Sequence, residues 1–190
     1  MILMEGVTKF LFELGALKHT TRSGWSVVGV PKPEVIASHI FRAIHVGNIL
    51  AEMEKCDRDK VVRMLLFHDV PEARTGDFHK IASNYIDKNE GEIRAASDQS
   101  KLLPPAMGRE YIVLLKEFNE GKTKEATVAR DADYLEAAIT AKEYLINGYV
   151  HAQEFLDRIK KVLVTPSAKK ILTEIEKSDG FWWKGLKKSS

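Results

Sequence analysis

A histidine and an aspartate stand side by side at the end of an apolar segment, at His68 and Asp69. The preceding residues have helical spacing, and Val61 and Leu65 lie on the same helix face as His68. A carboxylate at this position opposes the negative end of the helix dipole, and its burial is costly unless it is paired or binds a cation. An imidazole beside a carboxylate is a common half-site for a divalent metal. We therefore predict a metal-binding role for this pair.

A second histidine, His39, lies on the apolar face of a segment with helical spacing, residues 33–55. Apolar residues recur on this face every three or four positions, which predicts that His39 is buried. A lone buried histidine more often bonds a backbone carbonyl than a metal. The presence of His68 and Asp69 favours a metal ligand instead.

A metal site of this kind needs a further hard ligand, which the long segment 124–147 could provide. Apolar residues occupy most of the circumference of this predicted helix, so we expect it to be central. It carries two aspartates, Asp131 and Asp133. The periodicity does not choose between them.

The composition predicts an ordinary globular protein. The chain has 190 residues, of which 44% are hydrophobic and 29% charged, and we interpret residues 1–190 as one domain with a core over about 10–183 and a short basic tail. A net charge of +2 argues against a nucleic acid or an anionic membrane as partner. The single cysteine excludes a disulfide framework. With no secretory signal pattern and no apolar run of about 20 residues, we expect a cytoplasmic protein.

The elements that must position these residues are predicted to be helical almost throughout. One short stretch, residues 25–30, has strand-like composition but no obvious partner, and Pro71 ends the helix that leads to His68 and Asp69. We therefore predict an all-α bundle of non-parallel helices. The expected helices span about 5–16, 33–55, 58–69, 79–86, 90–99, 107–120, 124–147, 151–162 and 167–178.

Four motifs of this chain form one set: Leu17–Trp25, Glu34–His39, the string His68-Asp69-Val70-Pro71-Glu72-Ala73-Arg74-Thr75-Gly76-Asp77, and Arg130–Asp133. Together they resemble the HD-domain metal-dependent phosphohydrolases, and among them the 5'-deoxynucleotidase branch. The likeness spans roughly residues 10–183. It implies an HD-domain helical bundle that binds one divalent transition metal (Mn, Co, Fe, Ni or Zn) through His39, His68, Asp69 and Asp133.

The resemblance also suggests roles for residues around the metal. Glu72 would act as general base for the hydrolytic water or as an outer ligand through water, and Asp77 would protonate the leaving 5'-oxygen or hold the sugar. Arg22 offers a planar guanidinium for phosphate oxygens, and Trp25 could stack on a base or shape the sugar pocket. The structural alternatives are helix capping for the two acids, a surface salt bridge for Arg22 and core packing for Trp25.

The expected function is hydrolysis of nucleoside 5'-monophosphates, with 2'-deoxy substrates favoured by the resemblance. The alternatives are another HD phosphohydrolase, acting on a nucleoside triphosphate, a cyclic nucleotide or a guanosine polyphosphate, and a non-catalytic regulator that binds nucleotide or metal. The chain departs from the family at Phe78-His79-Lys80, where an apolar residue and Thr or Pro often follow. The aromatic cluster Phe181-Trp182-Trp183 and the family resemblance favour a homodimer.

Overall fold

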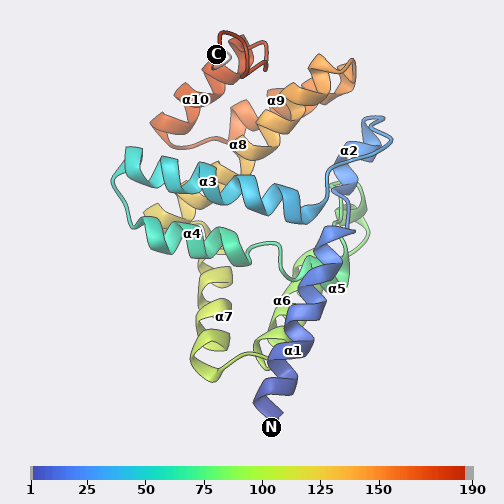
Figure 1. Cartoon of the computed structure of the whole chain (residues 1–190), viewed down its shortest axis with the longest axis vertical. Helices are drawn as coiled ribbons and strands as arrows, with labels where there is room; N and C mark the ends of the chain where they lie inside the picture. Colours follow the sequence, from blue (N-terminus) through green and yellow to red (C-terminus); the bar gives the residue numbers. More distant parts are fainter. Residues whose placement is uncertain (1, 187–190) are drawn as a thin grey trace.

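The computed structural model describes residues 2–186, and within them the chain folds into helices without a β-sheet. Three helices pack on one another in the middle of the molecule: α3 (Ile36–Glu54), α4 (Arg58–Phe67) and α8 (Lys124–Ile146). Figure 1 shows α3 and α4 side by side across the centre. The prediction of an all-α fold is confirmed.

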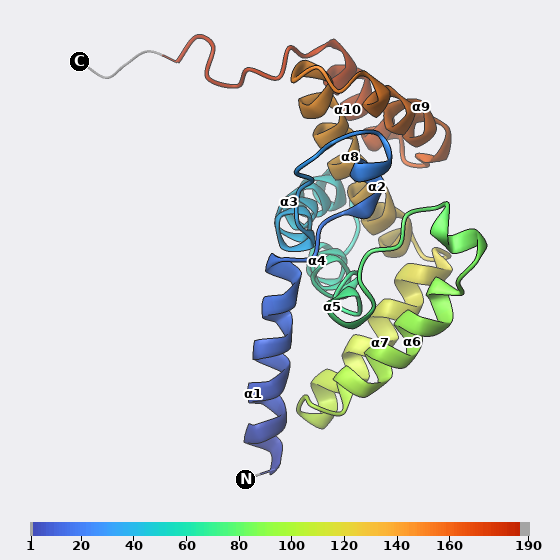
Figure 2. The same cartoon turned by 90° about the vertical axis from the view of Figure 1, so that its right-hand side faces the viewer.

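The remaining long helices extend the bundle at its two ends. At one end α1 (Ile2–Leu14) lies opposite the pair α6 (Lys88–Ser100) and α7 (Pro105–Glu120), and at the other end α9 (Gln153–Val162) and α10 (Pro166–Lys177) pack on α8 (Figure 2). The short elements are η1 (Gly15–Lys18), α2 (Ser23–Val27), α5 (Glu72–Thr75), η2 (Ala82–Asn84) and η3 (Val150–Ala152).

Side-chain caps set where several of these helices begin. Asp57, Asp87, Thr123 and Thr165 each accept a hydrogen bond from the backbone N–H three residues ahead, at the start of α4, α6, α8 and α10. Such a bond satisfies one of the free amide groups of a first helical turn. The caps therefore define the start of α4, which leads to His68 and Asp69, and of α8, which carries Asp133.

The close approach of α3 and α4 depends on Gly47. A Cβ at this position would lie 2.2 Å from Leu65 Cδ1 and 3.1 Å from Val61 Cγ1. A residue with a side chain would therefore force Leu65 and Val61 to shift or the two helices to separate. The contact lies between α3, which carries His39, and α4, which leads to His68.

Residues 25–30, whose composition is strand-like, form no strand, which agrees with the predicted all-α class: the segment begins in α2 and then turns at Gly29, which has φ +85°. One predicted element differs from the structure. The predicted helix 79–86 is reduced to the single turn η2. Its apolar side chains are exposed, so no partner surface stabilises a longer helix there.

One continuous cluster of buried apolar side chains runs through the described part of the chain, with the alanine-rich α8 at its centre. Within residues 2–186, no helix is both long enough and apolar enough to cross a bilayer. Beyond α10, the segment that contains Trp182 and Trp183 runs away from the helical body (Figure 2). These side chains are 78% and 53% exposed, so they are not part of the core.

Candidate metal centre

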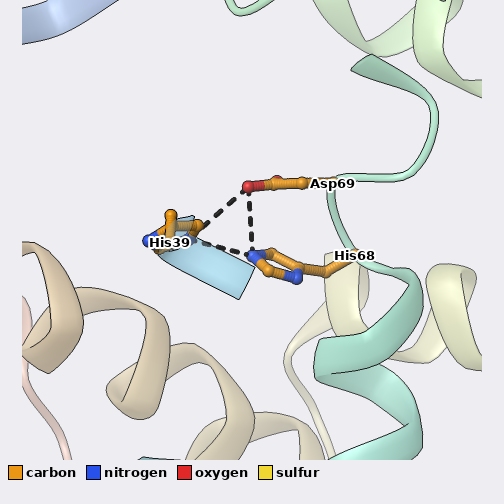
Figure 3. A group of neighbouring side chains, drawn as sticks. All are labelled: His39, His68 and Asp69. Atoms are coloured by element: carbon orange, nitrogen blue, oxygen red, sulfur yellow. Dashed lines mark hydrogen bonds and ion pairs between the residues drawn. The ribbon is translucent and has the colours of Figure 1, made fainter. Parts of the chain in front are cut away.

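Three predicted ligands meet between α3 and the end of α4. Figure 3 shows His39, His68 and Asp69 pointing toward one another. His39 Nε2 lies 3.3 Å from His68 Nε2 and 3.5 Å from Asp69 Oδ2, and His68 Nε2 lies 3.2 Å from the same oxygen. Both histidines are buried, and 17% of the Asp69 side chain is exposed. The site is therefore enclosed by protein and open toward solvent on the side of Asp69.

The hydrogen bonds of the two imidazoles decide which nitrogens carry protons. His68 Nδ1 lies 2.8 Å from the carbonyl oxygen of Leu65, and this oxygen can only accept a hydrogen bond. His39 Nδ1 donates in the same way to the buried carboxylate of Glu136. With both Nδ1 atoms engaged as donors, the two Nε2 atoms are left to face each other, and each would offer its lone pair to a bound metal ion. Two such nitrogens beside a carboxylate favour a cation between them.

Asp133, rather than Asp131, completes this set. Asp133 Oδ1 lies 3.1 Å from His39 Nε2 and 3.9 Å from His68 Nε2. Ligand atoms about 2.0–2.2 Å from one tetrahedral ion lie roughly 3.3–3.6 Å apart. His39, His68 and Asp69 lie close enough together to hold one metal ion, and Asp133 lies beside His39 as the candidate fourth ligand.

Asp131 has a structural position instead. Its carboxylate is 1% exposed and accepts hydrogen bonds from Val164 N, Thr165 N and Thr165 Oγ1. These contacts hold the chain between α9 and α10 against α8. The periodicity did not choose between Asp131 and Asp133. In the structure the two side chains leave α8 in different directions, and Asp133 is the one that points toward His39.

The charges around His39 favour a cation at this place. Burial and the charge of Arg22 lower the pKa of His39, but hydrogen bonds to Asp133 and Glu136 outweigh them and raise it to about 10. The pKa of Asp69 falls well below its usual range because the charge and hydrogen bond of His68 outweigh its burial. An electric field that stabilises a proton on the imidazole also stabilises a metal ion between the same groups.

Glu72 lies one turn beyond Asp69, in α5. It is 2% exposed, and Oε1 accepts a hydrogen bond from Lys88 Nζ at 2.9 Å. Its second oxygen, Oε2, is buried and has no hydrogen-bond partner among the described residues. Burial, followed by the charge of Asp69, raises the pKa of Glu72 to about 9, while Lys88 opposes the rise. A buried carboxylate oxygen without a partner is costly, which points to a role in chemistry.

Arg22 lies beside a proposed metal ligand, and Asp77 holds the loop that carries Arg22. Arg22 Nη1 lies 3.7 Å from Asp69 Oδ2, so its salt bridges point inward and not to the surface. Asp77 follows Gly76, whose φ of +76° turns the chain after α5. Asp77 Oδ2 accepts hydrogen bonds from the backbone N and the hydroxyl of Ser23, the residue after Arg22. Asp77 therefore ties the Arg22 loop to the His68-Asp69 segment.

Trp25 does not occupy the position that the sequence suggested. Its indole is 1% exposed, packs against Tyr144 and Phe155, and donates from Nε1 to Glu34 Oε1. A ring so enclosed has no free face on which a base could stack, so the core-packing alternative describes it better. Its packing supports the loop that carries Arg22.

A cavity of about 350 Å³ opens beside Arg22 and Asp77. Its other walls come from α2, from the turn after Asp77 and from α9, including Phe155 and Arg158. The residues that depart from the family pattern, Phe78-His79-Lys80, lie on this wall. The cavity thus adjoins the metal centre and is large enough for a small organic ligand.

Comparison with known proteins decides the family. A model described as "HD domain" matches residues 14–175, most of the chain. The protein belongs to the HD-domain family. The Bos taurus protein named 5'-deoxynucleotidase HDDC2 is 30% identical over 176 residues, which cover 90% of this chain and 85% of that protein.

Two solved structures show the same HD-domain fold. A conserved hypothetical protein from Pyrococcus furiosus is 29% identical, with a TM-score of 0.76 over 90% of this chain and 99% of its own. The cyanophage S-2L HD phosphohydrolase, described as bound to dA and one catalytic Zn²⁺, is 18% identical, with a TM-score of 0.55 over 88% of this chain and 95% of its own. At that identity it supports the fold alone.

Three residues of this HD domain were not singled out from the sequence: Glu136, Glu34 and Lys88. Glu136 lies one turn after Asp133 on α8, so the i, i+3 spacing could have found it. A metal-ligating histidine usually gives its second N–H to a carboxylate, which is what Glu136 provides for His39. Lys88 is 16 residues from Glu72, and no spacing rule links them.

Proposed function

We propose that this protein is a metal-dependent phosphomonoesterase that hydrolyses nucleoside 5'-monophosphates, with preference for deoxynucleotides. The main support is one juxtaposition: two histidine Nε2 atoms and two carboxylates, with the unpartnered buried oxygen of Glu72 one turn away. The name of the Bos taurus relative, a 5'-deoxynucleotidase, supports the substrate class.

The residues of the centre have separate roles in the proposed reaction. His39, His68, Asp69 and Asp133 would hold one divalent transition metal, with Zn, Mn, Co, Fe and Ni all compatible with two histidines and two carboxylates. When bound, this ion would bind a phosphoryl oxygen and lower the pKa of both the hydrolytic water and Glu72. Arg22, whose guanidinium lies beside Asp69, would bind the remaining phosphate oxygens.

The proton transfers follow from the positions of the two acids. As the water oxygen forms its bond to phosphorus, Glu72 Oε2 accepts one of the water protons. The bond between phosphorus and the 5'-oxygen breaks, and the 5'-oxygen takes up a proton, which gives a nucleoside and phosphate. Asp77, on the wall of the cavity, is the candidate to deliver that proton or to hold the sugar.

The cavity next to Arg22 is the proposed place for the nucleoside. It begins at the residues that would hold the phosphate and continues between apolar walls such as Val27 and Phe155. Sugar selectivity cannot come from direct contact with Trp25, which is buried. The preference for deoxy substrates rests on the names of the relatives.

The test is phosphate release from a panel of nucleotides with each of the five metals. Deoxynucleoside monophosphates should react faster than ribonucleoside monophosphates, by about 10- to 200-fold if an apolar wall rejects the 2'-hydroxyl. Triphosphates and cyclic nucleotides should react poorly, and Glu72→Ala should lower kcat by about 100-fold or more while the protein keeps its metal. Equal rates on AMP and dAMP would contradict the deoxynucleotide preference, and faster hydrolysis of triphosphates would contradict the substrate class.

A homodimer in the cytoplasm belongs to the same proposal. The exposed aromatic side chains beyond α10 support the dimer, because a monomer rarely leaves a large apolar group open to water. The single cysteine supports a reducing compartment.

A further inference from the structure

The ammonium group of Lys88 lies among three carboxylates next to the metal centre. Lys88 Nζ is 2.9 Å from Glu72 Oε1, 3.1 Å from Glu92 Oε1 and 4.0 Å from Asp77 Oδ1. The side chains of Glu72, Glu92 and Asp77 are 3%, 16% and 17% exposed, so they are well shielded from solvent. Ion pairs at such positions are screened far less than surface pairs.

The backbone of Lys88 is held firmly. It is the first residue of α6, directly after Asp87, whose side chain caps the helix through the amide of Glu90. Glu92 contacts the ammonium group from one turn further along the same helix. Lys88 is thus anchored on α6, while its partner Glu72 belongs to the short α5, and the two helices pack together.

Lys88 occupies one oxygen of Glu72 and leaves the other free. Oε1 is bound to the ammonium group, whereas Oε2 is buried without a partner among residues 2–186. A carboxylate held at one oxygen cannot rotate freely, so its second oxygen has a fixed direction. A general base whose oxygen is held in one orientation reacts faster than one whose oxygen is often misplaced.

We propose that Lys88 is a positioning residue that holds Glu72 by one oxygen and thereby presents the other oxygen to the hydrolytic water. The inference rests on the proposed function, because it assigns Glu72 the role of base. Lys88 itself touches neither water nor phosphate in this role. It acts entirely through the carboxylate of Glu72.

The central experiment is a double-mutant cycle of Lys88→Met and Glu72→Gln. In the otherwise wild-type protein, Lys88→Met should lower kcat by about 10- to 100-fold, the scale of a misplaced catalytic group, and change KM by less than about threefold. In the Glu72→Gln background, the same change should lower kcat by less than about twofold, because its partner is already disabled. Equal losses in both backgrounds would show that Lys88 acts independently of Glu72 and would overturn the proposal.

Two further variants separate positioning from general damage. Lys88→Arg keeps a cationic donor and should retain more of kcat than Lys88→Met, and an arginine no better than methionine would count against the proposal. Lys101→Met removes a similar pair from the other end of α6, since Lys101 Nζ lies 2.7 Å from Asp98 and its side chain is 69% exposed. This control should keep full activity and an unchanged Tm, and metal content should be unchanged in all these variants. Lys88→Met should lower Tm, because three shielded carboxylates lose their shared cation.

A readout without turnover separates this inference from the proposed function. In a crystal structure of Lys88→Met, the Glu72 carboxylate should leave the position that it has beside Lys88 in the wild type. A carboxylate that keeps its place would overturn the proposal, whatever the rate. Failure of the wild-type protein to release phosphate from any nucleoside monophosphate would instead refute the proposed function, and the crystal structures would still decide what holds Glu72.

Discussion

At the scale of single residues, the proton positions of the two site histidines are set by the protein itself. The carbonyl oxygen of Leu65 fixes the proton of His68 on Nδ1, and Glu136 does the same for His39. Each ring therefore has its orientation held, with Nε2 directed into the site, before any ion binds. This arrangement lowers the cost of assembling the site.

The position of Arg22 predicts a role in binding the phosphate of the substrate. Its guanidinium lies 3.7 Å from Asp69, and its exposed fraction is 21%, so it is close to the place where phosphate would bind. Arg22→Ala should lower kcat/KM for every nucleoside monophosphate by about 10- to 100-fold, the usual value of hydrogen bonds to a charged group. Steady-state kinetics on several bases would measure the effect.

The control for Arg22 is a charge-conserving change. Arg22→Lys keeps the charge but loses the planar pair of donors, so it should recover part of the activity. Metal content must be measured for both variants, because Arg22 is next to a ligand. Full activity of Arg22→Ala would assign this side chain a purely structural salt bridge.

At the scale of the elements, α8 presents two aspartates in opposite directions. Asp133 faces α3 and the metal centre, while Asp131 binds the segment that precedes α10. The two positions are related by about 200° around the helix, which explains how residues so close in sequence have different surroundings. Glu136, one turn beyond Asp133, supports His39 from the same side.

This difference predicts opposite phenotypes for two matched substitutions. Asp131→Ala should lower the free energy of unfolding by about 2–4 kcal/mol, because Thr165 loses a charged acceptor for both its amide and its hydroxyl. Asp133→Ala should leave stability nearly unchanged, yet abolish stoichiometric binding of metal. Urea denaturation and elemental analysis of both proteins would measure these effects.

The two variants serve as controls for each other. Loss of metal in Asp131→Ala with an intact fold would reverse the assignment of the ligand on α8. Retention of a full metal equivalent in Asp133→Ala would remove Asp133 from the set and leave His39, His68 and Asp69 as a three-residue site.

At the scale of the whole molecule, the aromatic segment beyond α10 lies outside the helical body (Figure 2). We expect light scattering at micromolar concentration to give the mass of a dimer. Replacing both Trp182 and Trp183 by serine should shift the protein toward the monomer, because burial of large aromatic groups is a main source of interface energy. Tyr85→Ser is the control, since Tyr85 is an aromatic residue with 86% exposure elsewhere on the surface.

A monomeric wild-type protein would contradict the dimer directly. A dimer that persists in the double tryptophan variant would place the interface on another surface. If Tyr85→Ser dissociated the dimer instead, the interface would include the turn that contains η2.

The sequence alone determined the helical class, most helix boundaries and the grouping of His39 with His68 and Asp69. Helical periodicity and capping are local signals, so they can be read along one chain. The sequence predicted too long a helix at residues 79–86, because an apolar pattern does not show whether a partner surface exists for the helix to pack on.

The tertiary structure alone decided what surrounds each candidate side chain. It gave Asp133 and Asp131 their different surroundings, enclosed Trp25 in the core, and brought Lys88 to Glu72. Each of these outcomes depends on which faces of separate elements come into contact. Packing between distant parts of the chain sets those faces, and no spacing within one helix or turn records it.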